Sequence, residues 1–211
     1  AIKPWLDENK LRTQDAVERL FRSPDIIDYE IDLPMDIPRV RRQAEEVASN
    51  YIQRYHKKVG KLLQTLTSAG EFLRDIDAAP TTEERSYFKP IPKTIAIGIP
   101  AICYLTEDGN VHIRERDLIR IYGHEGMGHA LNFVVTQTDS LPFFLTKQTH
   151  LTTATLESIA QFYERRIFED LRNSKETQKA LELEHRFDEV YRDARDFDLL
   201  QTYGSRLGQY A

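Results

Sequence analysis

The chain has 211 residues, of which 29 are Lys or Arg and 34 are Asp or Glu, so its formal net charge at pH 7 is -5. A chain of this length can bury one hydrophobic core without disulfide support, and its single cysteine excludes an internal disulfide. The acidic balance provides no basic footprint for nucleic acid, and no apolar stretch reaches the roughly 18 residues of a membrane span, so we expect neither kind of partner.

The N-terminal part of the chain is predicted to be helical. An apolar stripe predicts a short amphipathic helix over residues 12–22, and Pro24, Pro34 and Pro38 favour an extended connector over residues 23–37. A long helix is expected from Pro38 to about residue 68, because proline suits the first helical turn and apolar residues recur at helical spacing. Another short helix is expected over residues 71–78.

A loop with three prolines is expected over residues 80–92 and predicts how the chain is divided. We take this loop as the boundary between a helical N-terminal lobe, residues 1–90, and a second lobe, residues 91–211. The alternative is one compact domain. The N-terminus lacks a signal-peptide pattern, so a cytoplasmic location is the default expectation.

A β-hairpin is predicted at the start of the second lobe. The Ile-rich residues 94–106 end at a turn that contains Asp108-Gly109, and the chain returns through residues 111–113. Cys103 lies in the apolar run and is expected to be a buried thiol. Helices should follow over residues 116–136, 142–172 and 174–203, with Ser174 as a cap. The expected fold class is mainly α, with a small hairpin or sheet before the second-lobe helices.

The first of these predicted helices contains the segment His124-Glu125-Gly126-Met127-Gly128-His129. Two imidazoles and a carboxylate this close together are typical of zinc hydrolases, in which the histidines bind the metal and the glutamate acts as general base. On a regular α-helix, residues five apart diverge by roughly 140° and cannot share a metal. The motif therefore requires a distorted turn, and Gly126 and Gly128 make an i→i+5 bulge or a kink inexpensive.

A catalytic zinc site needs a third protein ligand, and Glu157 is the candidate. It lies 28 residues after His129 in the next predicted helix, a distance that suits an antiparallel helix pair. Glu164 follows seven residues later on the same face and is the candidate carboxylate to support a ligand histidine. Tyr163 is a candidate donor to the oxyanion, as are Tyr122, His112 and His150.

Each of these residues also has an ordinary structural interpretation. The two histidines could be a chance pair on a solvated helix, or ligands of a structural metal. Glu157 could be an exposed helix residue, and Glu164 could belong to a solvated charged face. The predicted sheet could present an edge strand to a peptide substrate, or it could only cap the helices.

Residues 95–172 resemble the metallopeptidase-like family called domain of unknown function 885. Its members carry H-E-x-x-P-G-H, a Leu-Pro-x-Phe element and an E-G-W-A-x-Y-x-E helix in this order. Here Met127 replaces the proline, and Ser158-Ile159 replace Gly-Trp. The first motif is also similar to H-E-x-x-G-H of the dipeptidyl peptidase III family. The matching positions are His124, Glu125, Gly128, His129, Leu141-Pro142-Phe143-Phe144, Glu157, Ala160, Tyr163 and Glu164.

Both resemblances imply a zincin-like helical fold of the gluzincin type, with His124, His129 and Glu157 on Zn²⁺ and Glu125 activating water. The expected function is hydrolysis of peptide substrates by a zinc metallopeptidase. Two alternatives stay open. One is a helical binding or structural protein with a vestigial or structural metal site, and the other is a zinc hydrolase of a non-peptide amide or ester.

Overall fold

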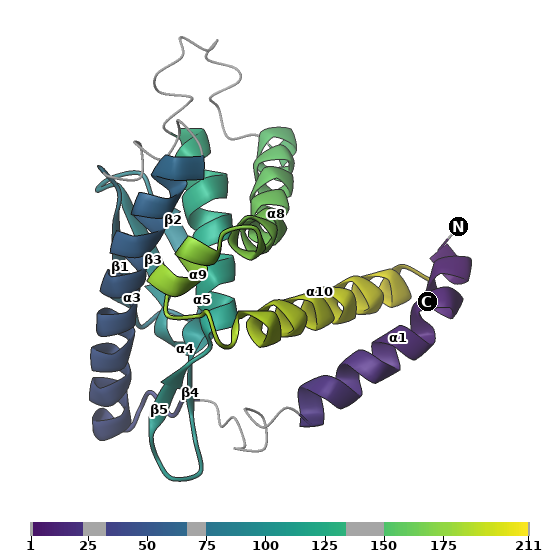
Figure 1. Cartoon of the computed structure of the whole chain (residues 1–211), viewed down its shortest axis with the longest axis horizontal. Helices are drawn as coiled ribbons and strands as arrows, with labels where there is room; N and C mark the ends of the chain where they lie inside the picture. The colour runs from purple at the N-terminus through teal and green to yellow at the C-terminus, as the bar shows by residue number, and fades with distance from the viewer. Residues whose placement is uncertain (1, 23–32, 67–74, 134–149, 211) are drawn as a thin grey trace.

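The computed structural model describes residues 2–22, 33–66, 75–133 and 150–210 (Figure 1). This part of the chain is mainly helical with a few short strands, as predicted. None of its helices combines the length and the apolar character needed to cross a membrane. The longer helices are α1 (Ile2–Arg22), α3 (Pro38–Leu66), α8 (His150–Arg172) and α10 (Phe187–Tyr210). The shorter helices are α4 (Ile99–Ile102), α5 (Glu115–Ile121) and α9 (Lys175–Ala180). Helix α5 continues directly into a π-helix, η2 (Tyr122–Ala130).

Three strands between α3 and η2 in the sequence form a sheet in the order β1-β3-β2. Strand β3 (Thr94–Gly98) pairs in parallel with β1 (Asp77–Thr81) and antiparallel with β2 (Tyr87–Lys89). The helix expected over residues 71–78 is therefore wrong at its C-terminal end, and its residues 71–74 lie outside the described residues. Pro80 is compatible with β1 because β1 is an edge strand, where a missing N–H breaks no ladder.

The expected boundary at residues 90 and 91 falls inside this sheet. Strands β1 and β2 come from the predicted first lobe, and β3, the central strand, comes from the predicted second lobe. The loop expected over residues 80–92 contains the end of β1 and all of β2. Backbone pairing across the boundary therefore joins the two predicted lobes through one sheet.

The predicted hairpin is confirmed, although it is shorter than expected. Strand β4 (Cys103–Leu105) pairs antiparallel with β5 (Val111–Ile113), and Gly109 in the turn has a φ of 80°, which favours glycine. The preceding Ile-rich run is divided between β3 and the short helix α4. Cys103 is buried as predicted, and burial raises the pKa of its thiol to about 12.

The hydrophobic core joins the sheet to the helices that carry the motif residues. Buried side chains come from α3, β3, α5, α8 and α10, and they form one cluster. Helix α5 contributes Leu118 and Ile119, directly before η2. The packing therefore holds the start of η2 against the sheet and α8. Other members of the cluster are Ala48, Ile52, Ile95, Ile97, Ile167, Phe168, Leu171 and Phe187.

The last predicted helix is interrupted. Ser174 caps α9 as expected, and its hydroxyl accepts a hydrogen bond from the Thr177 amide at 3.3 Å. The helix then stops, and Glu182 takes a left-handed conformation with φ of 60°. Its carboxylate pairs with Arg54 and Lys58 of α3, each at 3.0 Å. These contacts, distant in sequence, accompany the break between α9 and α10.

The first helix starts earlier than predicted, at Ile2 instead of residue 12. Its Pro4 is in the first turn, where no intrahelical N–H bond is lost. Helix α1 packs against α10, and Trp5 lies 6.2 Å from Tyr203 between ring centroids. Together these two helices extend away from the sheet and α8 (Figure 1).

We predict that Leu118→Ala destabilises the fold far more than Leu11→Ala. Leu118 is fully buried in α5, whereas Leu11 in α1 is 72% exposed. Loss of the buried side chain leaves a cavity that costs about 2–5 kcal/mol, and the exposed site should change stability by less than about 0.5 kcal/mol. Urea denaturation followed by circular dichroism measures both values. Equal effects would contradict this assignment of the core.

Candidate metal centre

The two motif histidines lie on the π-helix η2, so the distorted turn predicted from their spacing is confirmed. At the C-terminal end of η2, the Leu131 amide donates to the Gly126 carbonyl five residues earlier. With i→i+5 bonding, residues five apart lie about one turn apart, on a shared face. The rings of His124 and His129 accordingly lie close together, with centroids 5.0 Å apart and planes at 71°.

Two glycines of η2 allow α8 to approach closely. A Cβ at Gly128 would lie 2.5 Å from the Cα of Ala160, and one at Gly123 would lie 2.8 Å from the Tyr163 carbonyl oxygen. The distorted turn was predicted from Gly126 and Gly128, whereas Gly123 was not predicted to take part. The available signal was its spacing from Gly128, which is five residues, the same as that of the histidines.

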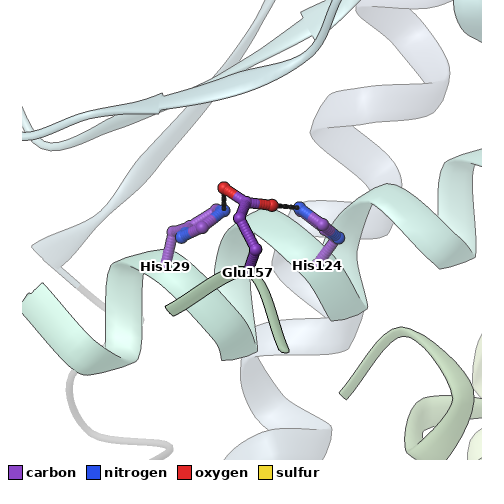
Figure 2. Close-up of side chains that lie close together, drawn as sticks. All are labelled: His124, His129 and Glu157. Atoms are coloured by element: carbon purple, nitrogen blue, oxygen red, sulfur yellow. Dashed lines mark ion pairs between the residues drawn. The ribbon is translucent and has the colours of Figure 1, made fainter. Parts of the chain in front are cut away.

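Glu157 of α8 lies between the two imidazoles (Figure 2). Its Oε2 is 3.4 Å from Nε2 of His124, and its Oε1 is 3.3 Å from Nε2 of His129. One ligand atom from each residue can be chosen so that all three lie within 4.8 Å of one another. Two ligands of a tetrahedral zinc ion are separated by about 3.4 Å, given metal–ligand distances of about 2.1 Å. The spacing of the three side chains is therefore compatible with a metal ion.

The cluster is accessible from solvent. The side chains of His124 and His129 are each 22% exposed, and that of Glu157 is 47% exposed. Burial lowers the pKa of His129, which favours the neutral imidazole that a metal ion requires. For this histidine the lowered pKa disfavours the simpler interpretation, an ion pair between a protonated ring and Glu157.

Glu164 supports His124 from the opposite side of the ring. Its Oε2 lies 3.1 Å from Nδ1 of His124, which leaves Nε2 directed toward Glu157. The Glu164 contact is the largest influence on His124 and raises the pKa of its imidazole. A carboxylate on the second nitrogen is the usual way in which a ligand histidine is oriented. A contact between Glu164 and a motif histidine was predicted from the sequence.

Arg120 of α5 in turn holds Glu164. Its Nε donates to Oε1 of Glu164 at 2.7 Å, and it also lies 3.7 Å from Asp117. Arg120 was not predicted from the sequence. Its position four residues before His124 was the only available signal, and on a helix such a spacing merely places two residues on neighbouring turns.

Glu125 is buried beside the cluster, next to strand β2. Burial raises the pKa of its carboxyl to about 7, opposed by nearby His124 and by a hydrogen bond from the Phe88 amide of β2. One cavity of about 320 Å³ is lined by Glu125 together with His124 and Glu164. A proton acceptor and one candidate ligand therefore face the same space.

The three candidate oxyanion donors with described side chains have contacts away from the cluster. Tyr163 packs against the hydrophobic core, and its ring contacts Phe162 at 5.4 Å between centroids. The hydroxyl of Tyr122 donates to the Ile52 carbonyl at 3.3 Å inside the protein. His112 is exposed on β5, beside Tyr104. The side chain of His150 and the element Leu141-Pro142-Phe143-Phe144 lie outside the described residues.

No protein-family model, curated protein or solved structure matches the chain. The likeness of its motifs to two metallopeptidase families stays a prediction from the sequence.

We predict that Gly128→Ala separates α8 from η2 and weakens metal binding. The added methyl would meet the backbone of Ala160, and such overpacking costs about 1–3 kcal/mol. Gly204→Ala is the matched control, because no atom lies within 4 Å of a Cβ there and alanine favours the helix by about 0.4–1 kcal/mol. Denaturation and zinc titration of both variants provide the test. Parent-like stability and zinc affinity in Gly128→Ala would contradict the role of this close approach.

Proposed function

We propose that the protein is a zinc-dependent peptidase in which His124, His129 and Glu157 bind the metal and Glu125 is the general base. One observation carries this proposal: a π-helical turn and an adjacent helix bring the two imidazoles and a carboxylate within metal-binding distance. The His124-Glu125 sequence within the same turn adds a carboxylate of the kind that gluzincins use as a base.

The chemistry of the donor atoms favours a catalytic zinc site over a structural one. Structural zinc sites are closed by four protein ligands, commonly thiolates, whereas catalytic sites use three and leave one position open. The cluster offers two imidazoles and one carboxylate, and these side chains are partly exposed. Two histidines and a carboxylate also suit iron, but the adjacent buried Glu125 is better explained by hydrolysis.

When bound, zinc would act as a Lewis acid that polarises a carbonyl group and lowers the pKa of water toward neutrality. Glu125 would accept a proton from the attacking water and transfer it to the amine that leaves. Burial raises the pKa of this carboxyl to about 7. A cation bound beside it would lower that pKa and keep the group ionised.

The remaining residues would fix the geometry of the site. Glu164 orients the ring of His124, and Arg120 holds Glu164 in place. Strand β2 is an edge of its sheet and contacts η2, as expected of a strand that could pair with a peptide. The carboxylate of Glu125 accepts a hydrogen bond from the backbone N–H of Phe88. A substrate strand would therefore pair with other backbone groups of β2, or it would displace this hydrogen bond.

We predict that the purified protein contains about one zinc ion per chain and that His129→Ala and Glu157→Ala lose it. Each substitution removes one of three ligands. His185→Ala is the control, because this histidine is 92% exposed and lies outside the cluster. Elemental analysis after dialysis measures the metal, and circular dichroism checks folding. Unchanged zinc in folded Glu157→Ala would remove this residue from the site.

We predict that Glu125→Gln retains zinc but hydrolyses a mixed peptide library about 10²–10⁴-fold more slowly. The side-chain oxygen of the introduced glutamine can still accept a hydrogen bond from the backbone N–H of Phe88, but the side chain is not a base at neutral pH. Mass spectrometry of the library, with zinc analysis of the same samples, separates loss of chemistry from loss of metal. Equal hydrolysis by parent and variant would contradict the role of Glu125. If both are inert toward peptides but the parent alone cleaves amide or ester probes, a non-peptide hydrolase is supported instead.

A further inference from the structure

The cavity that reaches His124 and Glu125 is also lined by an exposed arginine. Arg85, in the segment between β1 and β2, lines this cavity of about 320 Å³ together with Ser86 and the site residues. The two acidic residues immediately before it, Glu83 and Glu84, do not line the cavity. The segment therefore presents a positive charge, and not its negative ones, to the space beside the site.

The backbone next to Arg85 is held against the central strand of the sheet. The Gly98 amide donates to the hydroxyl of Ser86 at 2.9 Å. A Cβ at Gly98 would lie 2.8 Å from the Glu83 carbonyl oxygen and 3.1 Å from that of Glu84, so the segment packs directly on the glycine backbone. The hydroxyl of Tyr87 donates to the Glu83 carboxylate at 2.8 Å. These contacts position the base of the Arg85 side chain.

Three of the other charged groups at the cavity are engaged in ion pairs, but the guanidinium of Arg85 is not. Arg120 binds Glu164, and Asp117 contacts both Arg116 and Arg120. Within the described ranges, no carboxylate forms an ion pair with Arg85, whose side chain is exposed. An unmatched guanidinium beside a candidate peptidase site is available for an anionic group of a ligand.

Resting on the proposed function, we infer that Arg85 binds a carboxylate of the peptide substrate and selects substrates that carry one near the cleaved bond. A guanidinium offers parallel N–H donors that match a carboxylate in two hydrogen bonds. Either the α-carboxylate at the end of a peptide or the side chain of an acidic residue could provide the group. Both sources place the same chemistry against Arg85, so the test must compare them.

The test measures peptide affinity, which does not require turnover. Zinc-loaded Glu125→Gln protein is titrated calorimetrically with three forms of one short peptide: free acid, C-terminal amide, and amide with a glutamate as last residue. We expect the free acid or the glutamate amide, or both, to bind about 10- to 100-fold more tightly than the plain amide, as expected for a charge-assisted pair. Which of them does so identifies the source of the carboxylate.

Variants assign the preference to Arg85. In the same background, Arg85→Ala should abolish the difference between the peptides, and Arg85→Lys should retain part of it because the charge remains. Arg39→Ala, an exposed arginine of α3, is the control and should preserve the difference. A preference that survives Arg85→Ala would overturn the inference, and so would equal or undetectable binding of all three peptides.

Hydrolysis of the peptide library by the parent protein separates this inference from the proposed function. A parent that cleaves free acids and amides equally well retains the peptidase assignment, whereas the role of Arg85 is lost.

Discussion

The candidate site depends on the i→i+5 turn of η2. On a regular α-helix the rings of His124 and His129 would diverge by roughly 140°, whereas the π-helical turn brings their centroids to 5.0 Å. The same period places Gly123 and Gly128 against α8, whose backbone approaches closely enough for Glu157 to lie between the rings. One distortion of the backbone thus brings the two candidate histidine ligands together and also allows the close approach of α8, which carries Glu157.

The surroundings of this turn are consistent with a site that is held rigidly. Arg120, Glu164 and His124 form a chain of charge-assisted contacts that leads from α5 through α8 to the cluster. Glu125 is buried between the cluster and the edge strand β2, an expensive position for a carboxylate. A purely structural helix has little reason to contain three glycines, a π-helical turn and a buried acid within nine residues. Such local costs are typical of functional sites.

Local sequence signals predicted those parts of the fold that local interactions decide. The helix at Pro38, the Ser174 cap, the hairpin turn and the distorted motif turn each follow from a few neighbouring residues. Strand β1 was missed because its partner β3 is distant in sequence, and backbone pairing overrides a weak helical pattern. The break at Glu182 is accompanied by ion pairs to Arg54 and Lys58 of α3, and no nearby residue signals it. The roles proposed for Arg120, Gly123 and Arg85 depend on other elements that pack beside them.

The most direct test of the central claim is a crystal structure of the zinc-loaded protein, with anomalous differences recorded at the zinc absorption edge. The account predicts one anomalous peak about 2.0–2.2 Å from Nε2 of His124, Nε2 of His129 and a carboxylate oxygen of Glu157, with η2 still π-helical. A zinc peak elsewhere, or a regular α-helix at residues 122–130 with the two rings facing apart, would contradict it.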